Sequence, residues 1–271
     1  MSTTQDFTTF GSWLKLTGQL ELVTPLRIGA GQGDEFGLAD IAVVKNRQGE
    51  PYIPGSSFKG VLRSSIEAFL RTIDPNLACL CVTTQTGFDC PTTKSPEDLE
   101  AYLAKFKDED DMYLNGTCRV CQVFGSSGLA SKVQIPDLRL AEKWLGPYQL
   151  RNGVSIDRDT ETAAAQRLFT IEAVPAGTRF TFELLIENGT PADQGLVLLG
   201  LRAFEQGMVA LGGATSRGLG QVKLTVDHCE EVSNDPKALF DFLVSGTAQE
   251  VDEQARTAKI QALRQEVMPH A

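Results

Sequence analysis

The chain has 271 residues, 42% of them hydrophobic and 22% charged, so it can bury a sizeable core as one large domain or one domain with insertions. No apolar run reaches membrane-spanning length, and the first residues lack the basic and apolar regions of a signal peptide, so we expect a cytoplasmic protein without a membrane partner. The net charge of −10 argues against non-specific nucleic-acid binding by the overall field. A local basic groove is still compatible with this charge, because the acids crowd into residues 97–111 and 230–253 while residues 45–71 are net basic.

The first predicted elements are two extended segments separated by a glycine-rich loop. Residues 13–23 alternate apolar and polar side chains, which is the period of a half-buried strand. The loop at residues 29–37 is followed by a second extended segment, residues 38–44, and not by the helix that a dinucleotide-binding fingerprint requires. Asp40 lies beside this apolar segment, so it should be held more firmly than the acids of the loop. An aspartate in such a position is more often a turn or edge-strand residue than a catalytic group.

A helix is predicted at residues 56–73, directly after the turn signal Pro54-Gly55. Ser56 and Ser57 are good N-cap residues, because a hydroxyl can accept hydrogen bonds from the free N–H groups of the first helical turn. Apolar residues then recur at helical spacing, which predicts one buried face.

Two cations near the start of this helix suggest an anion site. The free N–H groups and the helix dipole favour negative charge at a helix N-terminus. Lys59 and Arg63 are four residues apart and would share one face near that end. Lys59 and Arg63 are compatible with a phosphate-binding site. They are also compatible with an ordinary capped helix that carries two solvent-exposed cations.

The segment of about residues 77–121 has the character of an insertion and is rich in cysteine. Five of the six cysteines lie in it: Cys79, Cys81, Cys90, Cys118 and Cys121. Without a secretory signal, this clustering favours metal over disulfides. Cys118 and Cys121 form a CxxC pair that can share one tetrahedral zinc, and Cys90 with either Cys79 or Cys81 would supply the other pair. The alternative is a set of buried reduced thiols. A catalytic zinc is disfavoured, because both histidines lie far along the chain.

The middle of the chain predicts further strands around a polar stretch. Residues 132–140 alternate like a strand, with Pro136 placing it at an edge or bulge. Residues 150–167 are polar and irregular, and this stretch could project from the body or be a solvated loop. Residues 169–174 and 178–186 are predicted to be strands joined as a hairpin by a Pro-Ala-Gly turn.

The last third predicts one amphipathic helix, a glycine-rich loop and a strand before peripheral helices. The helix covers residues 193–211 and ends in Leu-Gly-Gly-Ala-Thr-Ser-Arg-Gly-Leu-Gly, whose glycines allow close backbone approach to a ligand beside Arg217. Residues 221–226 form the final strand, and residues 236–245 and 249–267 form two peripheral helices.

This order of elements and motifs resembles the RAMP superfamily and, within it, the repeated backbone subunit of type III CRISPR effector complexes. The resemblance rests on three blocks, residues 53–63, 118–125 and 211–222, and on residues 153–158, which resemble the start of the family's thumb hairpin. It covers residues of about 13–226. The Ile-Pro-Gly-Ser-Ser-x-Lys-Gly and Ser-Arg-Gly-x-Gly motifs are specific together, whereas either alone would be weak.

The resemblance implies an α+β fold with a modified ferredoxin-like (RRM-type) core. Residues 1–228 would form the RAMP domain, with a zinc-binding insertion at about residues 74–121 and a thumb at about residues 150–175. Residues 229–271 would be a C-terminal helical extension. Several copies would stack along a CRISPR guide RNA with other effector subunits. The cysteine insertion and this extension depart from the smaller members of the family.

The resemblance also implies which residues act on RNA. Asp40 corresponds to the aspartate that cleaving members need, and it would work with Mg²⁺ or another divalent cation on the complementary target RNA. The residues implied to bind RNA are Arg27, Gly55, Ser56, Ser57, Lys59, Arg63, Ser155, Ile156, Asp157, Arg158, Gly213, Ser216 and Arg217. Two alternatives remain: a scaffold that binds guide RNA without cutting, and a zinc-stabilised protein-interaction domain unrelated to RNA.

Overall fold

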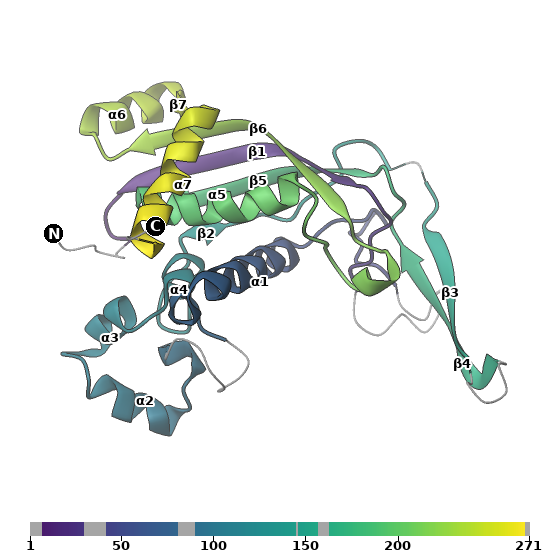
Figure 1. The fold of residues 1–271 in the computed structure, drawn as a ribbon. Coiled ribbons are helices and arrows are strands. Elements are labelled where there is room, and N and C mark those ends of the chain that lie inside the picture. The colour runs from purple at the N-terminus through teal and green to yellow at the C-terminus, as the bar shows by residue number, and fades with distance from the viewer. Residues whose placement is uncertain (1–6, 30–41, 81–89, 145, 157–162, 269–271) are drawn as a thin grey trace.

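The computed structural model describes residues 7–29, 42–80, 90–144, 146–156 and 163–268. Its centre is a five-stranded sheet in the order β2-β5-β1-β6-β7, in which every pairing is antiparallel. Two helices lie against one face of this sheet, as Figure 1 shows. These elements are β1 (Ser12–Leu22), α1 (Gly55–Ile73), β2 (Val133–Gln134), β5 (Arg179–Glu187), α5 (Pro191–Glu205), β6 (Val222–Ser233) and β7 (Gln249–Glu250).

The connection of the core elements is that of a ferredoxin-like fold. Along the chain they follow the order β1, α1, β2, β5, α5 and β6, which is a β-α-β-β-α-β unit with the long insertion placed between α1 and β2. The predicted α+β class is therefore confirmed, and the order of elements is consistent with the expected ferredoxin-like core.

The core lies between the sheet and its two helices. Alternate residues of β1 and β5 point to this side, so Leu16 and its partner Leu184 are fully buried, as is the pair two positions along, Leu14 and Ile186. Phe58 of α1 stacks on Phe204 of α5 with ring centroids 4.7 Å apart. Burying each such side chain contributes roughly 1.5–3 kcal/mol, so this layer dominates the stability of the fold.

The start of α1 differs from the prediction in its cap. The helix begins at Gly55 with Pro54 in the N-cap position, and no side chain caps it from there. Ser56 and Ser57 lie inside the first turn instead, so their predicted capping role is wrong. The carboxylate of Asp137 takes over, because its Oδ1 accepts a hydrogen bond from the Gly55 N–H at 2.9 Å.

The hairpin predicted from residues 169–174 and 178–186 is wrong. The first of these segments belongs to β4 (Ala163–Ala173), which pairs with β3 (Gln149–Ile156) in a separate two-stranded sheet. The second is β5, which pairs with β1 and β2. The Pro-Ala-Gly turn therefore joins two sheets, and Figure 1 shows β3 and β4 projecting from the body, in the part of the chain where a thumb is expected.

Three other predicted segments are shorter than expected. The last peripheral helix begins at Glu253 and not at residue 249, because Gln249 and Glu250 form a short strand. The second core helix ends at Glu205, because Gly207 turns the backbone into the left-handed region with φ 68°. The predicted strand at residues 132–140 contains only β2, at the sheet edge, followed by isolated bridges at Leu138 and Leu140. The predicted strand at residues 38–44 is described only from residue 42, where Val43 forms one isolated bridge.

The cysteine-rich insertion is made of short helices below the core. It contains α2 (Pro96–Leu103), α3 (Glu109–Asn115) and α4 (Arg119–Phe124), with single 3-10 turns at Pro75–Leu77 and Pro91–Thr93. Figure 1 shows α4 beside α1, while α2 and α3 lie farther out.

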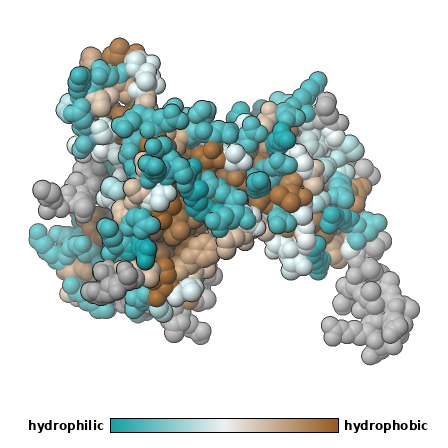
Figure 2. Space-filling view, turned by 45° about the horizontal axis from the view of Figure 1, so that its top comes forward, coloured by the Kyte–Doolittle hydropathy of each residue, from teal (hydrophilic) through white to brown (hydrophobic). Residues whose placement is uncertain are grey.

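The C-terminal segment is joined to the core rather than separate from it. β6 continues through the expected boundary at residue 228 to Ser233, and α6 (Pro236–Ser245) and α7 (Glu253–Val267) follow. α7 approaches α5 so closely that a Cβ on Gly195 would lie 2.1 Å from the Lys259 carbonyl oxygen. α6 carries exposed apolar side chains, and Figure 2 shows hydrophobic surface at that end of the molecule. In the described part of the chain, no helix is long and apolar enough to cross a membrane.

Candidate metal centre and nucleic-acid interface

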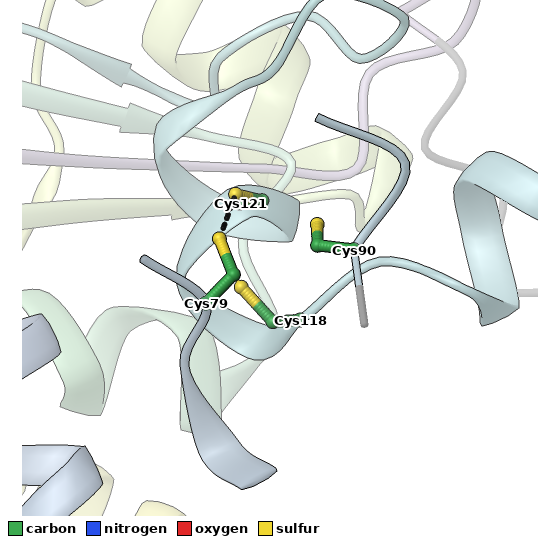
Figure 3. Close-up of side chains that lie close together, drawn as sticks. All are labelled: Cys79, Cys90, Cys118 and Cys121. Carbon is green, nitrogen blue, oxygen red and sulfur yellow. Dashed lines mark hydrogen bonds between the residues drawn. The ribbon is translucent and has the colours of Figure 1, made fainter. Parts of the chain in front are cut away.

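Four cysteines from three parts of the insertion converge on one point, as Figure 3 shows. Cys79 follows the first 3-10 turn, Cys90 precedes the second, and Cys118 and Cys121 lie at the start of α4. Their sulfur atoms all lie within 4.8 Å of one another, and the Cys79 and Cys121 sulfurs are 3.6 Å apart. The sequence left Cys79 and Cys81 as alternatives; the structure brings Cys79 into the cluster, and Cys81 lies outside the described residues.

The cluster fits a metal such as zinc. A tetrahedral zinc with Zn–S bonds of about 2.3 Å needs sulfurs roughly 3.8 Å apart, which is close to the spacing found. All four cysteines are at most 2% exposed, so a metal here would be shielded from water. Hydrogen bonds from the Cys121 and Cys79 thiols lower the pKa of Cys118, which favours the thiolate that a metal requires. By contrast, burial raises the pKa of Cys229, outside the cluster, to about 11.

Arg63 of α1 points at this cluster. One terminal nitrogen, Nη2, lies 2.9 Å from the Cys121 sulfur, and the other, Nη1, donates to the Gly125 carbonyl oxygen at 3.0 Å. Its Nε donates to Glu67 on the next turn of α1 at 2.8 Å. Arg71, two turns after Arg63, donates to the Cys79 carbonyl oxygen at 2.8 Å.

Lys59 also makes protein contacts. Its Nζ donates to the Ser131 hydroxyl at 2.6 Å and to the Val133 carbonyl oxygen at 2.8 Å. Burial lowers the pKa of Lys59, and the nearby positive charge of Arg63 lowers it further. Lys59 and Arg63 thus share a face of α1, as the spacing predicts, but both hold the segment that follows the CxxC pair. Their RNA-binding role stays a prediction.

The glycine-rich loop brings together residues that are far apart in the sequence. The Gly213 N–H donates to the Arg27 carbonyl oxygen at 2.8 Å. A Cβ on Gly212, whose φ is 75°, would lie 2.1 Å from that same oxygen, so only glycine fits there. Within the described residues, the buried Nε of Arg27 has no hydrogen-bond partner. The guanidinium of Arg27 places a positive charge next to Gly213, which favours an anionic ligand at this loop.

The same loop contacts the base of the projecting hairpin. Residues Thr215–Arg217 form a 3-10 turn in which Ser216 and Arg217 are exposed. The Arg217 guanidinium lies over the Phe169 ring of β4, 5.9 Å from its centroid. Arg27 and the two loop residues Gly213 and Arg217, predicted from two separate parts of the chain, therefore gather beside this hairpin.

The remaining predicted residues are only partly described. Ser155 and Ile156 end β3, while Asp157, Arg158 and the predicted catalytic Asp40 lie outside the described residues.

Sequence reasoning missed Glu172, a buried carboxylate in β4. Its oxygens accept hydrogen bonds from the Val43 N–H at 3.1 Å and from the Lys45 Nζ at 2.8 Å. Glu172 therefore ties the base of the hairpin to the chain a few residues after Asp40. The only signal in the sequence was a single acid in an apolar strand, which did not identify its partners.

Sequence comparison relates this chain to proteins of one family. The profile of the RAMP superfamily matches residues 19–223. The chain is 25% identical over 239 residues to a protein named CRISPR system Cms endoribonuclease Csm3 from Methanothermobacter thermautotrophicus, covering 77% of this chain and 82% of that protein. A protein of the same name from Mycobacterium tuberculosis is 27% identical over 238 residues, covering 80% and 89% of the two chains. Because the profile matches more than half of the chain, including both core helices, the insertion and the hairpin, the chain belongs to the RAMP superfamily, as its motifs predict.

Proposed function

We propose that this chain is a backbone subunit of a type III CRISPR effector complex, which binds guide RNA and cleaves complementary target RNA. The observation that carries the proposal is the gathering of Arg27, Gly213 and Arg217 at the base of a projecting hairpin in a member of this superfamily. The relatives named above are called endoribonucleases, which supports the cleavage step. The complex works in the cytoplasm.

Recognition of the guide relies on its backbone. The glycine-rich loop allows close backbone approach and carries the exposed Arg217, and Arg27 lies directly behind it. Such contacts hold phosphates and 2′-hydroxyls whatever the base, so base pairing with the guide supplies the sequence specificity. Affinity should then fall with salt according to the number of phosphates held. The hairpin, including Ser155 to Arg158, enters between guide and target and displaces a base.

Cleavage depends on Asp40. Displacing one base frees the local RNA backbone from A-form geometry, so a ribose 2′-hydroxyl can align with the adjacent phosphorus. A divalent cation such as Mg²⁺, held by the Asp40 carboxylate, would activate this hydroxyl and offset the charge that develops on phosphorus. Glu172 supports the proposal, because it anchors the chain at Val43, three residues after Asp40.

The cysteine cluster holds a structural zinc. The four buried sulfurs support this assignment by their spacing, and the CxxC pair lies on α4 next to α1. Zinc would fix the insertion to the core and take no part in the cleavage step.

The test is cleavage of a labelled target RNA by the reconstituted complex, with wild type, Asp40→Ala and Asp34→Ala subunits, each with and without EDTA. Asp34 lies six residues before Asp40 in the sequence, in the glycine-rich stretch, and is the matched control. We expect evenly spaced products from wild type and Asp34→Ala, none from Asp40→Ala, and unchanged target binding in all three. Full cleavage by Asp40→Ala would assign the chemistry to another residue. Tight RNA binding without any cleavage by wild type would leave a scaffold, and purification without RNA would favour a protein-interaction domain.

A further inference from the structure

We propose that Arg63 is a positioning residue of the cysteine cluster, where it donates to the Cys121 thiolate and offsets the negative charge of the metal-bound site. The sequence motif instead suggests a residue that holds an RNA phosphate. This inference rests on the proposed metal in the cluster, but it is independent of guide binding and of cleavage.

The geometry of the guanidinium carries the proposal. Its Nη2 lies 2.9 Å from the Cys121 sulfur, its Nη1 donates to Gly125 at the end of α4, and its Nε donates to Glu67. All three nitrogens thus have protein acceptors, and the Arg63 side chain is only 23% exposed. At least three of the five N–H groups of Arg63 are therefore directed at protein atoms, toward Cys121, Gly125 and Glu67.

The contact between Arg63 and Cys121 would offset the negative charge of the metal-bound thiolates. Four thiolates around one divalent cation leave an excess of negative charge, which is costly at buried sulfurs unless donors surround it. Groups that donate to metal ligands raise metal affinity and fix ligand orientation. Arg63 brings a positive charge directly to a sulfur, whereas Arg71 reaches only the carbonyl oxygen of Cys79.

Glu67 aims the guanidinium. Its carboxylate lies 2.8 Å from the Arg63 Nε and 3.9 Å from an Arg71 nitrogen, and Glu67 itself is buried. Glu67 lies between the two arginines on α1 and accepts from the Nε of Arg63. The terminal nitrogen Nη2 of Arg63 is then directed toward the Cys121 sulfur. The metal site is thereby connected to α1, whose Lys59 holds the segment after the CxxC pair.

The first experiment measures zinc affinity of the isolated full-length chain by competition with a chromophoric chelator at one fixed pH. Arg63→Gln should weaken zinc binding about 10- to 100-fold, which is the usual effect of losing such a supporting contact. Arg71→Gln is the matched control, because Arg71 lies on the same helix and near the same Glu67 but touches no sulfur; its loss should be several-fold smaller. Zinc affinity of Arg63→Gln equal to that of wild type would overturn the proposal.

A second measurement needs no variant, so it holds even if Arg63→Gln folds poorly. In the wild-type chain loaded with ¹¹³Cd²⁺, NMR should detect scalar coupling between the metal and a guanidinium proton of Arg63, transmitted through the Cys121 sulfur. Metal binding by all four cysteines without this coupling would overturn the role of Arg63 alone. Failure of wild type to bind Zn²⁺ or Cd²⁺ would overturn the metal site and this inference together, and would leave the RNA functions untouched.

Discussion

Replacing Asp193 with asparagine should destabilise the protein more than any other single loss of a carboxylate charge in the described residues. Asp193 is completely buried at the start of α5, where its oxygens lie 2.8 Å from the Lys132 Nζ and 2.9 Å from an Arg119 nitrogen. It also accepts a hydrogen bond from the Thr190 N–H, which completes the capping box of α5. The asparagine keeps the shape and one acceptor oxygen but leaves two cations beside a neutral group.

The magnitude follows from the burial of this network. Removing one partner of a buried ion pair costs about 3–5 kcal/mol, because the remaining charge is left without compensation away from water. Lys132 is 6% exposed and Arg119 17% exposed at their side chains, so neither can regain full hydration without moving. For a chain of this size, that loss corresponds to a fall in Tm of roughly 6–20 °C.

The assay is urea unfolding and thermal melting of the zinc-loaded chain, with Asp98→Asn as the matched control. Asp98 occupies the same third position of α2, accepts from the capping Ser95 hydroxyl, and is exposed. Its replacement should cost less than about 1 kcal/mol, since exposed charges at a helix N-terminus contribute little. Equal losses in the two variants would refute the argument that burial of the ion pairs sets the size of the effect.

Three further outcomes are expected. Gly212→Ala should weaken both folding and RNA binding, because the new Cβ would meet the Arg27 carbonyl oxygen. Gly218→Ala is the control, since Gly218 has a similar positive φ but open space around it. RNA titrations and thermal melts of the two variants therefore separate the effect of the clash from that of backbone strain. The free energy of unfolding should decline as the pH rises from the usual thiol pKa of 9.0 toward about 11. The reason is the raised pKa of Cys229, because in this range the folded chain retains a proton that the unfolded chain loses. Unfolding of Cys229→Ala across the same range should show a smaller decline. Chelation of the metal should make the insertion sensitive to limited proteolysis, while the far-UV circular dichroism of the chain changes little because the core stays folded. Equal resistance to proteolysis before and after chelation would contradict the structural role of zinc.

Local signals in the sequence predicted the two core helices and the two C-terminal helices, but not the three short helices of the insertion. α6 was predicted with its observed ends because Asp235 caps its start and Gly246, with φ 70°, ends it. α1 was predicted one residue short, since its capping acceptor is Asp137, a residue 82 positions later. The CxxC pair and the clustering of cysteines likewise predicted the metal cluster, although spacing alone left Cys79 and Cys81 as equal candidates.

Non-local pairing explains what the sequence did not predict. The pattern of β4 and β5 with a turn between them is that of a hairpin, yet β4 finds its partner in β3, and β5 in β1. Periodicity shows which side of a strand is buried but carries no information on which strand lies beside it. The partners of Arg63 were hidden for the same reason, because Cys121 and Gly125 are about sixty residues away in the sequence.

The connection between the two sheets fixes the base of the projecting hairpin, which forms an arm of set length. The chain passes from β4 into β5 while Val174 exchanges backbone hydrogen bonds with Leu26 and the Gly177 N–H donates to Leu22. Those bonds fasten the base of the arm to Leu22 at the end of β1 and to Leu26 just after it, and Figure 1 shows β3 and β4 projecting beyond this point. The eleven residues of β4, at about 3.3 Å each, set a reach of roughly 36 Å. Adding two residues to each strand of the arm would move its tip outward by about 7 Å and leave the sheet that anchors it unchanged.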